Sequence, residues 1–210
     1  EPHAPQPHRQ RILDAFDPLP HWYRPLSEAM LDRTEFPLHA ITQRPAAMYH
    51  SWGSMNAWLR QIHTRNPLYV PGSLCDELNL ADGDWAWVIS NHGRIKVEVA
   101  RMEAVNSSTL WTWNAIGKRE GAWGLDQDAP ESRKGFLLNH LINELLPPRE
   151  DGMRWSNSDP VTGQAAWYDL RVRIEKAEPA ERSEPHFPAL AKPAPEPHPA
   201  ELRYGQEWAE

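Results

Sequence analysis

Residues 36 to 58 read Phe36-Pro-Leu-His-Ala-Ile-Thr-Gln-Arg-Pro-Ala-Ala-Met-Tyr-His-Ser-Trp-Gly-Ser-Met-Asn-Ala-Trp58, and this stretch carries the strongest local signals in the chain. It predicts a strand from Leu38 to Thr42 that ends at Gln43 and Arg44. Pro45 has no N–H to donate to a ladder of strand hydrogen bonds, so it directs the chain off the sheet. The loop beyond it is rich in hydrogen-bonding groups around Gly53: Tyr49, His50, Ser51, Ser54 and Asn56.

A strand that delivers a guanidinium, hydroxyls, an amide and a glycine into one loop suits an anionic ligand with many acceptor oxygens, such as a pyrophosphate. Arginine offers a planar fork of donors to phosphate oxygens, and glycine lets backbone N–H groups approach closely. We therefore interpret the loop as a candidate anion site. The alternative from these residues alone is a polar surface loop in which Arg44 forms an ordinary ion pair.

Composition narrows the classes of function. The chain has 210 residues, a formal net charge of −7 and a sequence pI of about 5.8, so its bulk charge gives no support to nucleic-acid binding. Its single cysteine, Cys75, excludes an intrachain disulfide framework and a cysteine-only metal cluster. No His-x-x-x-His or Cys-x-x-Cys spacing is present, so we expect no metal to be held by this chain alone and assign it no catalytic residue.

Proline content divides the chain into three zones. Residues 1–35 hold six prolines and are expected to form an extended lead-in, while residues 36–176 hold nearly all strand and helix signals. Residues 177–210 form a proline-rich acidic tail, with seven prolines between residues 179 and 199. The chain starts at Glu1 rather than Met and has no apolar run near the ~20 residues that cross a bilayer. We expect a piece of a longer protein whose localisation its own start does not reveal.

Within the central zone the dominant period is that of strands. Five further segments are predicted to be strands: Leu68–Val70, Trp85–Ser90, Ile95–Ala100, Leu110–Trp113 and Tyr168–Ile174. Apolar and polar residues alternate in Ile95–Ala100 and Tyr168–Ile174, and the bulkiest residues alternate in Trp85–Ser90. Two helices are expected: a short one capped by Ser73 and ending near Leu78, and a longer one from Gly135 to Leu146 that Pro147 and Pro148 terminate. This pattern predicts a mostly β protein, a β-barrel with helical insertions, rather than a parallel α/β sheet.

Several motifs follow one another in a defined order. They are Thr42-Gln-Arg44, the aromatic-His-hydroxyl step at Tyr49, Asn66-Pro67 before a strand, Gly83-Asp84, Gly93-Arg94, Asn139 and Asp159-Pro160. This order resembles the C-terminal molybdopterin-dinucleotide-binding domain of the dimethyl-sulfoxide-reductase superfamily of molybdenum oxidoreductases. The likeness covers about residues 36–176 and implies a six-stranded double-psi β-barrel. Within the superfamily, the sequence most resembles the branch of polysulfide, thiosulfate and tetrathionate reductases and of membrane-anchored sulfite dehydrogenases.

The resemblance implies that ten residues contact the cofactor: Thr42, Gln43, Arg44, Tyr49, His50, Ser51, Ser54, Asn56, Asn139 and Tyr168. Two of them depart from the family pattern, which often has glycine at position 43 and lysine near position 168. From the residues alone, Asn139 inside an apolar helix needs either a backbone carbonyl or a ligand as partner, because an unpartnered buried amide costs about 1–3 kcal/mol. Trp111, Trp113 and Trp123 could stack on a ring of the cofactor, with packing as the default role.

The family implies a molybdenum bis(molybdopterin guanine dinucleotide) cofactor shared with upstream domains of the same catalytic polypeptide, and an iron–sulfur cluster elsewhere in the enzyme. It implies two partner subunits, an iron–sulfur electron-transfer subunit plus a membrane anchor subunit, with a small sulfur oxyanion or polysulfide as substrate. Lys118 and Arg119 would favour such an anion if they line its access path. The location implied is a bacterial membrane face, the cytoplasmic one slightly preferred. The same domain in a formate dehydrogenase or nitrate reductase is an alternative, and a non-enzymatic, Trp-rich β-barrel binding module is another.

Overall fold

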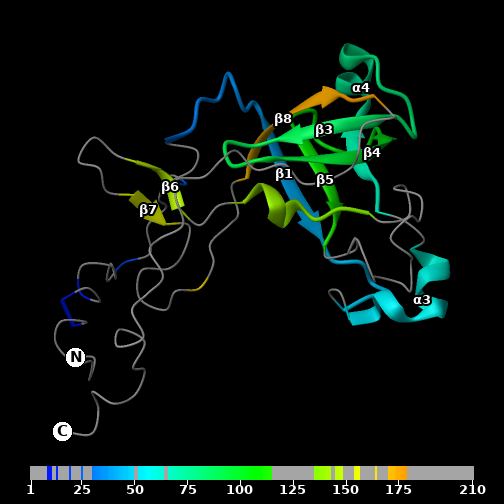
Figure 1. Ribbon diagram of the computed structural model, residues 1–210, viewed down its shortest axis with the longest axis horizontal. Coiled ribbons are helices and arrows are strands. Elements are labelled where there is room, and N and C mark those ends of the chain that lie inside the picture. Colours follow the sequence, from blue (N-terminus) through cyan, green and yellow to red (C-terminus); the bar gives the residue numbers. More distant parts are fainter. Residues whose placement is uncertain are drawn as a thin grey trace, which may run out of the picture.

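The computed structural model describes residues 30–49, 52–63, 66–114, 135–142, 145–148, 154–156 and 170–178, together with Arg9, Gln10, Leu13, Leu19, Pro25 and Gln164. Six strands close into a barrel in the order β1-β5-β2-β4-β3-β8 (Figure 1). Their bounds are β1 Leu38–Gln43, β2 Leu68–Pro71, β3 Trp85–Ile89, β4 Arg94–Met102, β5 Thr109–Trp113 and β8 Arg171–Lys176. The predicted six-stranded, mostly β barrel is confirmed.

Parallel pairing inside this barrel distinguishes it from a simple meander. β1 pairs with β5 in parallel, and β2 pairs with β4 in parallel, whereas the other four neighbouring pairs are antiparallel. Parallel neighbours require a crossover connection rather than a hairpin. Two such crossovers agree with the double-psi arrangement that the family resemblance implies.

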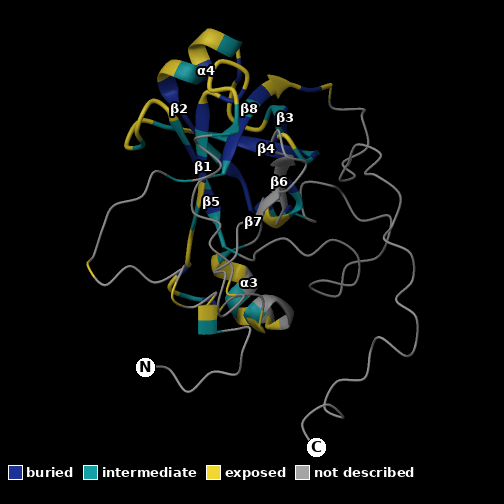
Figure 2. Cartoon of the chain, turned by 90° about the vertical axis from the view of Figure 1, so that its left-hand side faces the viewer, coloured by how far each residue is buried: buried dark blue, intermediate teal, exposed yellow. Residues whose placement is uncertain are grey.

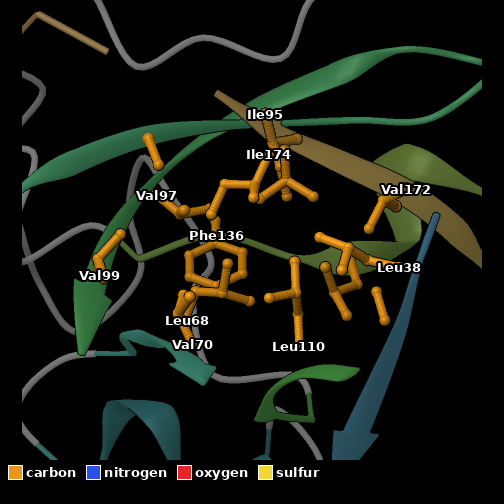
Figure 3. Packing of buried hydrophobic residues seen from close by; sticks show 14 of the residues in the cluster. Leu38, Leu68, Val70, Ile95, Val97, Val99, Leu110, Phe136, Val172 and Ile174 are labelled. Carbon is orange, nitrogen blue, oxygen red and sulfur yellow. The ribbon is translucent and has the colours of Figure 1, made fainter. Parts of the chain in front are cut away.

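The barrel interior is filled by alternate residues of the strands, because successive side chains of a strand point to opposite faces. Figure 3 shows aliphatic side chains from several strands meeting around Phe136. Leu68, Val70 and Leu110 have no exposed surface, nor does Val172 of β8. The core of the barrel is therefore built by the strands that the alternating pattern predicts.

The helix expected to be capped by Ser73 begins two residues earlier and has a different cap. α4 spans Gly72–Leu78, its N-cap is Pro71, and no side chain caps its first turn. It ends at Asn79, which adopts a left-handed conformation with φ of 52°. Asparagine tolerates this conformation better than most residues.

The helix predicted from Gly135 to Leu146 is wrong. The structure has the 3-10 helix η3 (Leu138–Leu141), followed by strand β6 (Leu145–Pro148), which pairs with β7 (Arg154–Ser156). The reason is tertiary: side chains elsewhere bind two carbonyls that an α-helix would use internally. Asn66 Nδ2 donates to the Phe136 carbonyl, and Ser90 Oγ donates to the Leu141 carbonyl at 2.7 Å. Phe136, Leu138 and Leu141 still enter the core, as the predicted apolar stripe requires.

The barrel has two different ends. α4 lies at one end, and α3 (Ala57–Ile62), preceded by the 3-10 helix η1 (Trp52–Met55), lies at the other (Figures 1 and 2). β1 and β5 run parallel and both finish at the α3 end. No helix in the described part of the chain is long and apolar enough to span a bilayer.

Candidate cofactor-binding site

The site begins where β1 ends. Gln43 pairs with Trp113, the last residue of β5, and the N–H of Asn114 donates to the Gln43 carbonyl at 2.7 Å. Thr42 pairs with Thr112, which is fully buried. The alternation of the strand separates the two predicted residues: Thr42 is half-buried on the inward-facing side, whereas Gln43 is exposed on the outer face.

Arg44 is the first residue beyond this ladder, and it is exposed. Pro45 directly after it is buried, so the chain turns back towards the barrel once the arginine has been presented. Within the described residues the Arg44 guanidinium has neither a hydrogen bond nor an ion pair. An exposed guanidinium with open donors fits a phosphate or pterin oxygen better than it fits the ion pair considered as the alternative.

The loop after Arg44 is a series of turns. Backbone hydrogen bonds join Met48 N–H to the Pro45 carbonyl, Trp52 N–H to that of Tyr49 and Asn56 N–H to that of Gly53. The Tyr49 side chain is 71% exposed. Ser54 lies in η1, and His50 and Ser51 lie outside the described residues, as does Tyr168 near β8.

Two residues of this loop have structural duties. A Cβ on Gly53 would lie 2.7 Å from Leu59 Cδ1, so the glycine makes room for α3 to pack on the loop. Asn56 is the N-cap of α3: its Oδ1 accepts from the N–H groups of Trp58 and Leu59 at 2.9 and 3.4 Å. This cap uses the acceptor oxygen of Asn56 and leaves its amide nitrogen as the group that could reach a ligand.

Asn66 connects three parts of this end of the barrel. Only 3% exposed, it donates through Nδ2 to the carbonyls of Trp113 and Phe136 at 3.4 and 3.3 Å, and its Oδ1 accepts from Thr112 Oγ1 at 2.9 Å. The last residue of β5 is thereby tied to the segment that leads to Asn139. Asn66 was not among the predicted site residues, although the Asn66-Pro67 step belongs to the motif order that carried the resemblance.

Asn139 lies between two such ties. Asn66 binds the segment at Phe136, and Ser90, in the turn between β3 and β4, binds it at Leu141. Between these points Leu138 is buried and Asn139 is exposed. The predicted apolar-helix setting of Asn139 is therefore wrong, but the residue faces outward at the end of the barrel to which Gln43 and Trp113 are joined. Ser90 was missed as well, because a serine in a hairpin gives no sequence signal for a distant partner.

Aromatic side chains line the outer face of β2 and β5. Tyr69 and Trp111 stack with ring centroids 4.1 Å apart, and Trp113 meets both Trp111 and His63 edge-on at 4.9 and 5.3 Å. Burial in this group lowers the pKa of His63, so its neutral form is favoured. The rings of Trp111 and Trp113 pack on protein partners, while Trp123, Lys118 and Arg119 lie outside the described residues.

The donor set at the α3 end fits an extended anionic cofactor. Arg44 offers a guanidinium, Thr42 a hydroxyl, and Gln43 and Asn139 offer amides that can donate or accept. Phosphate oxygens need such donors, and a pterin ring needs both donors and acceptors. In the described part of the chain, no group of three His, Cys, Asp or Glu side chains is placed to hold a metal ion.

A closed β-barrel with hydrogen-bond donors gathered at one end is suited to a polar, phosphate-bearing cofactor. Comparison of the sequence with protein families makes this specific: residues 38–152 match the molydopterin dinucleotide binding domain, and the chain belongs to that family. The family assignment supersedes the alternative of a Trp-rich binding module without a cofactor.

The similar proteins include one curated relative and one solved structure. The chain is 56% identical over 177 residues to a sulfite dehydrogenase subunit of Allochromatium vinosum, a match that covers 84% of this chain and 18% of that protein. In structure it resembles acetylene hydratase from Pelobacter acetylenicus with a TM-score of 0.58 at 20% identity, covering 79% of this chain and 22% of the other. The second likeness concerns the fold alone. The chain thus spans less than a quarter of either protein's length.

Proposed function

We propose that the chain is the cofactor-capping domain of the catalytic subunit of a molybdenum oxidoreductase. The observation that carries this proposal is the exposed Arg44 guanidinium, presented at the barrel end where Asn139 is also exposed. Membership in the molydopterin dinucleotide binding family supplies the ligand class. The division into a lead-in (1–35), a domain (36–176) and a tail (177–210) stays a prediction.

The chain's own residues bind and orient the cofactor. Arg44 holds a phosphate or pterin oxygen, and Thr42, Gln43 and Asn139 fix the polar edges through hydrogen bonds. Tyr49, His50, Ser51, Ser54 and Tyr168 remain proposed contacts, with the Asn56 contribution limited to its amide nitrogen. When bound, the molybdenum bis(molybdopterin guanine dinucleotide) supplies the redox chemistry. The domain excludes water and positions the cofactor.

We further propose sulfite as the substrate of the intact enzyme. The support is the 56% identity to a protein whose name makes it one subunit of a sulfite dehydrogenase. The word "subunit" in that name fits an enzyme with further chains. As these partners we propose a membrane anchor together with an iron–sulfur subunit that carries electrons away from the oxidised substrate. We also propose that the upstream domains hold an iron–sulfur cluster and that the enzyme lies at a membrane face.

Replacing Arg44 by alanine in the intact enzyme is expected to lower cofactor content while leaving the barrel folded. A charge-assisted hydrogen bond is worth about 1.5–3 kcal/mol, which is roughly a ten- to hundredfold change in occupancy. Molybdenum and guanine nucleotide are measured per catalytic polypeptide in the purified protein. Arg101→Ala, a change of the same kind at the α4 end, serves as control and should load normally. Full loading of the Arg44 variant would remove this residue from the site.

Sulfite oxidation by the purified intact complex is the expected activity. Initial rates are measured with sulfite, thiosulfate, tetrathionate, polysulfide, nitrate and formate, each with a suitable electron donor or acceptor dye. Turnover of sulfite or another sulfur substrate agrees with the proposal. Turnover restricted to nitrate or formate would leave the cofactor-binding role intact and overturn the substrate.

A further inference from the structure

η1 and α3 carry large apolar side chains in open solvent. Trp52 is 82% exposed, Trp58 77% and Ile62 64%, and we call these three residues the α3 patch. Trp58 and Ile62 are four residues apart on the helix and therefore share one face. Single exposed apolar residues are ordinary, but a group of them marks an interaction site.

Local hydrogen bonds and packing hold α3 in the position that exposes the α3 patch to solvent. The Asn56 side chain caps the first turn of α3, and the His63 N–H donates to the Leu59 carbonyl at 3.1 Å in the last. Leu59, on another face of the helix, packs towards Gly53, where an added Cβ would collide with it. The helix thus uses Leu59 to attach itself to its own domain. Trp58 and Ile62 are not needed for that attachment.

The opposite end of the barrel has the character of a solvated surface. Arg101 pairs with Glu103 at 2.7 Å and with Asp76 of α4, and Lys176 pairs with Asp84 at 2.9 Å. Hydrogen bonds from Arg101 lower the pKa of Asp76, so this carboxylate stays charged. In the described part of the chain, seven large apolar side chains are exposed, and five of them fall between Ile41 and Ile62. The apolar exposure therefore belongs to the α3 side of the molecule.

We propose that the α3 patch docks against the remainder of the catalytic subunit, that is, the polypeptide beyond these 210 residues. The chain spans 18% of the length of the sulfite dehydrogenase polypeptide it matches and 22% of acetylene hydratase, so most of each protein lies outside the equivalent region. The patch lies at the barrel end where β1 finishes, and Arg44 follows the last residue of β1 directly. A cofactor shared with upstream domains brings those domains to this end, and in this respect the inference rests on the proposed function. Exposed tryptophans are typical anchors of such contacts.

Hydroxyl-radical footprinting of the intact catalytic subunit tests the proposal without any substitution. The oxidation rate of each tryptophan is read by mass spectrometry, with the buried Trp87 as slow reference and the denatured protein as fast reference. We expect Trp52 and Trp58 to be oxidised as slowly as Trp87 in the folded protein. Rates near those of the denatured protein, with Trp87 still slow, would overturn the docking.

Other occupants give different results in the same experiment. Protection that disappears on dilution, together with a dimer in sedimentation, would assign the patch to a second copy and overturn the proposal. Protection seen only after addition of phosphatidylglycerol vesicles would assign it to a membrane. Protection found only in cofactor-loaded samples would assign it to stacking on the cofactor. Either of these also overturns the proposal.

Variants of α3 separate docking from folding. Trp58→Ser combined with Ile62→Ser should raise the oxidation rate of Trp52 while Trp87 stays slow. Trp58→Phe combined with Ile62→Leu retains the apolar face and should leave Trp52 protected, as should Gln61→Ala. An unchanged Trp52 rate in the serine variant would contradict the proposal. The cofactor content of the same samples distinguishes the docking from the proposed function. Protected tryptophans in a protein that binds no molybdopterin would contradict the proposed function alone. Reactive tryptophans in a cofactor-loaded protein would contradict the docking alone.

Discussion

Replacing Phe136 by alanine is expected to lower the free energy of unfolding of the 210-residue chain by about 3–5 kcal/mol, the range for a buried Phe→Ala change. Phe136 is 6% exposed and lies among side chains from several strands of the barrel (Figure 3). No neighbouring strand can collapse into the space without breaking a ladder, because the barrel is closed. The cavity should therefore persist.

Urea unfolding followed by far-ultraviolet circular dichroism measures this effect. Phe136→Leu retains most of the apolar volume and should cost clearly less than the alanine change. A loss below about 1 kcal/mol for Phe136→Ala, the centre of the range for ordinary point mutations, would show that residue 136 does not fill the barrel.

The second large effect is expected at Asn66. Asn66→Ala removes both donated bonds and leaves the carbonyls of Trp113 and Phe136 without this partner. Since each buried group left unsatisfied costs about 1–3 kcal/mol, we expect the free energy of unfolding to fall by about 2–4 kcal/mol. In the intact enzyme the same change should lower molybdenum content, because the segment that carries Asn139 loses one of its two ties.

Thr112→Val is the matched control for Asn66. It removes the hydroxyl that binds Asn66 Oδ1 and the Pro67 carbonyl but keeps the shape of the side chain and both bonds donated by Asn66. The free energy of unfolding should fall by less than in Asn66→Ala, by about 1–2 kcal/mol, because one buried acceptor loses its donor instead of two, and cofactor loading should stay normal. Equal losses for the two variants would mean that the donated bonds of Asn66 carry no special weight.

The strands could be predicted from the sequence because their signal is local. In β4, Ile95, Val97 and Val99 alternate with Lys96 and Glu98, and the three apolar residues are the ones that enter the core. The parallel pairing of β1 with β5 has no such local signal, since it depends on crossovers between distant segments. It followed only from the resemblance to a known family.

The segment from Gly135 to Leu146 shows where local reasoning fails. Its leucines have helical spacing, yet Gly135 adopts φ of 62°, and Pro147 and Pro148 end up in strand β6. The deciding bonds come from Asn66 and Ser90, which are 70 and 51 residues away from their partners in the sequence. The helix propensity of a short segment contains no information about such long-range bonds, and tertiary contacts override it.

The candidate site was predictable to a similar extent. Thr42, Gln43 and Arg44 could be placed because they follow directly from the end of a strand. Asn56 was predicted as a cofactor contact, and the structure shows a role that was not predicted: it caps α3, since asparagine is also a preferred helix cap. The supporting residues Asn66 and Ser90 could not be recognised, because their partners are backbone carbonyls that any residue would supply.

That last property has a consequence for how this protein can change. The ties to residues 136 and 141 end on main-chain oxygens, so they hold whatever side chains occupy positions 139 and 140. The side chains at those two positions can therefore be exchanged while the backbone that carries them stays in place. Natural drift or directed evolution can alter the groups offered there without dismantling the fold that carries them, and this makes residues 139 and 140 the first places to diversify when such an enzyme is to be re-tuned.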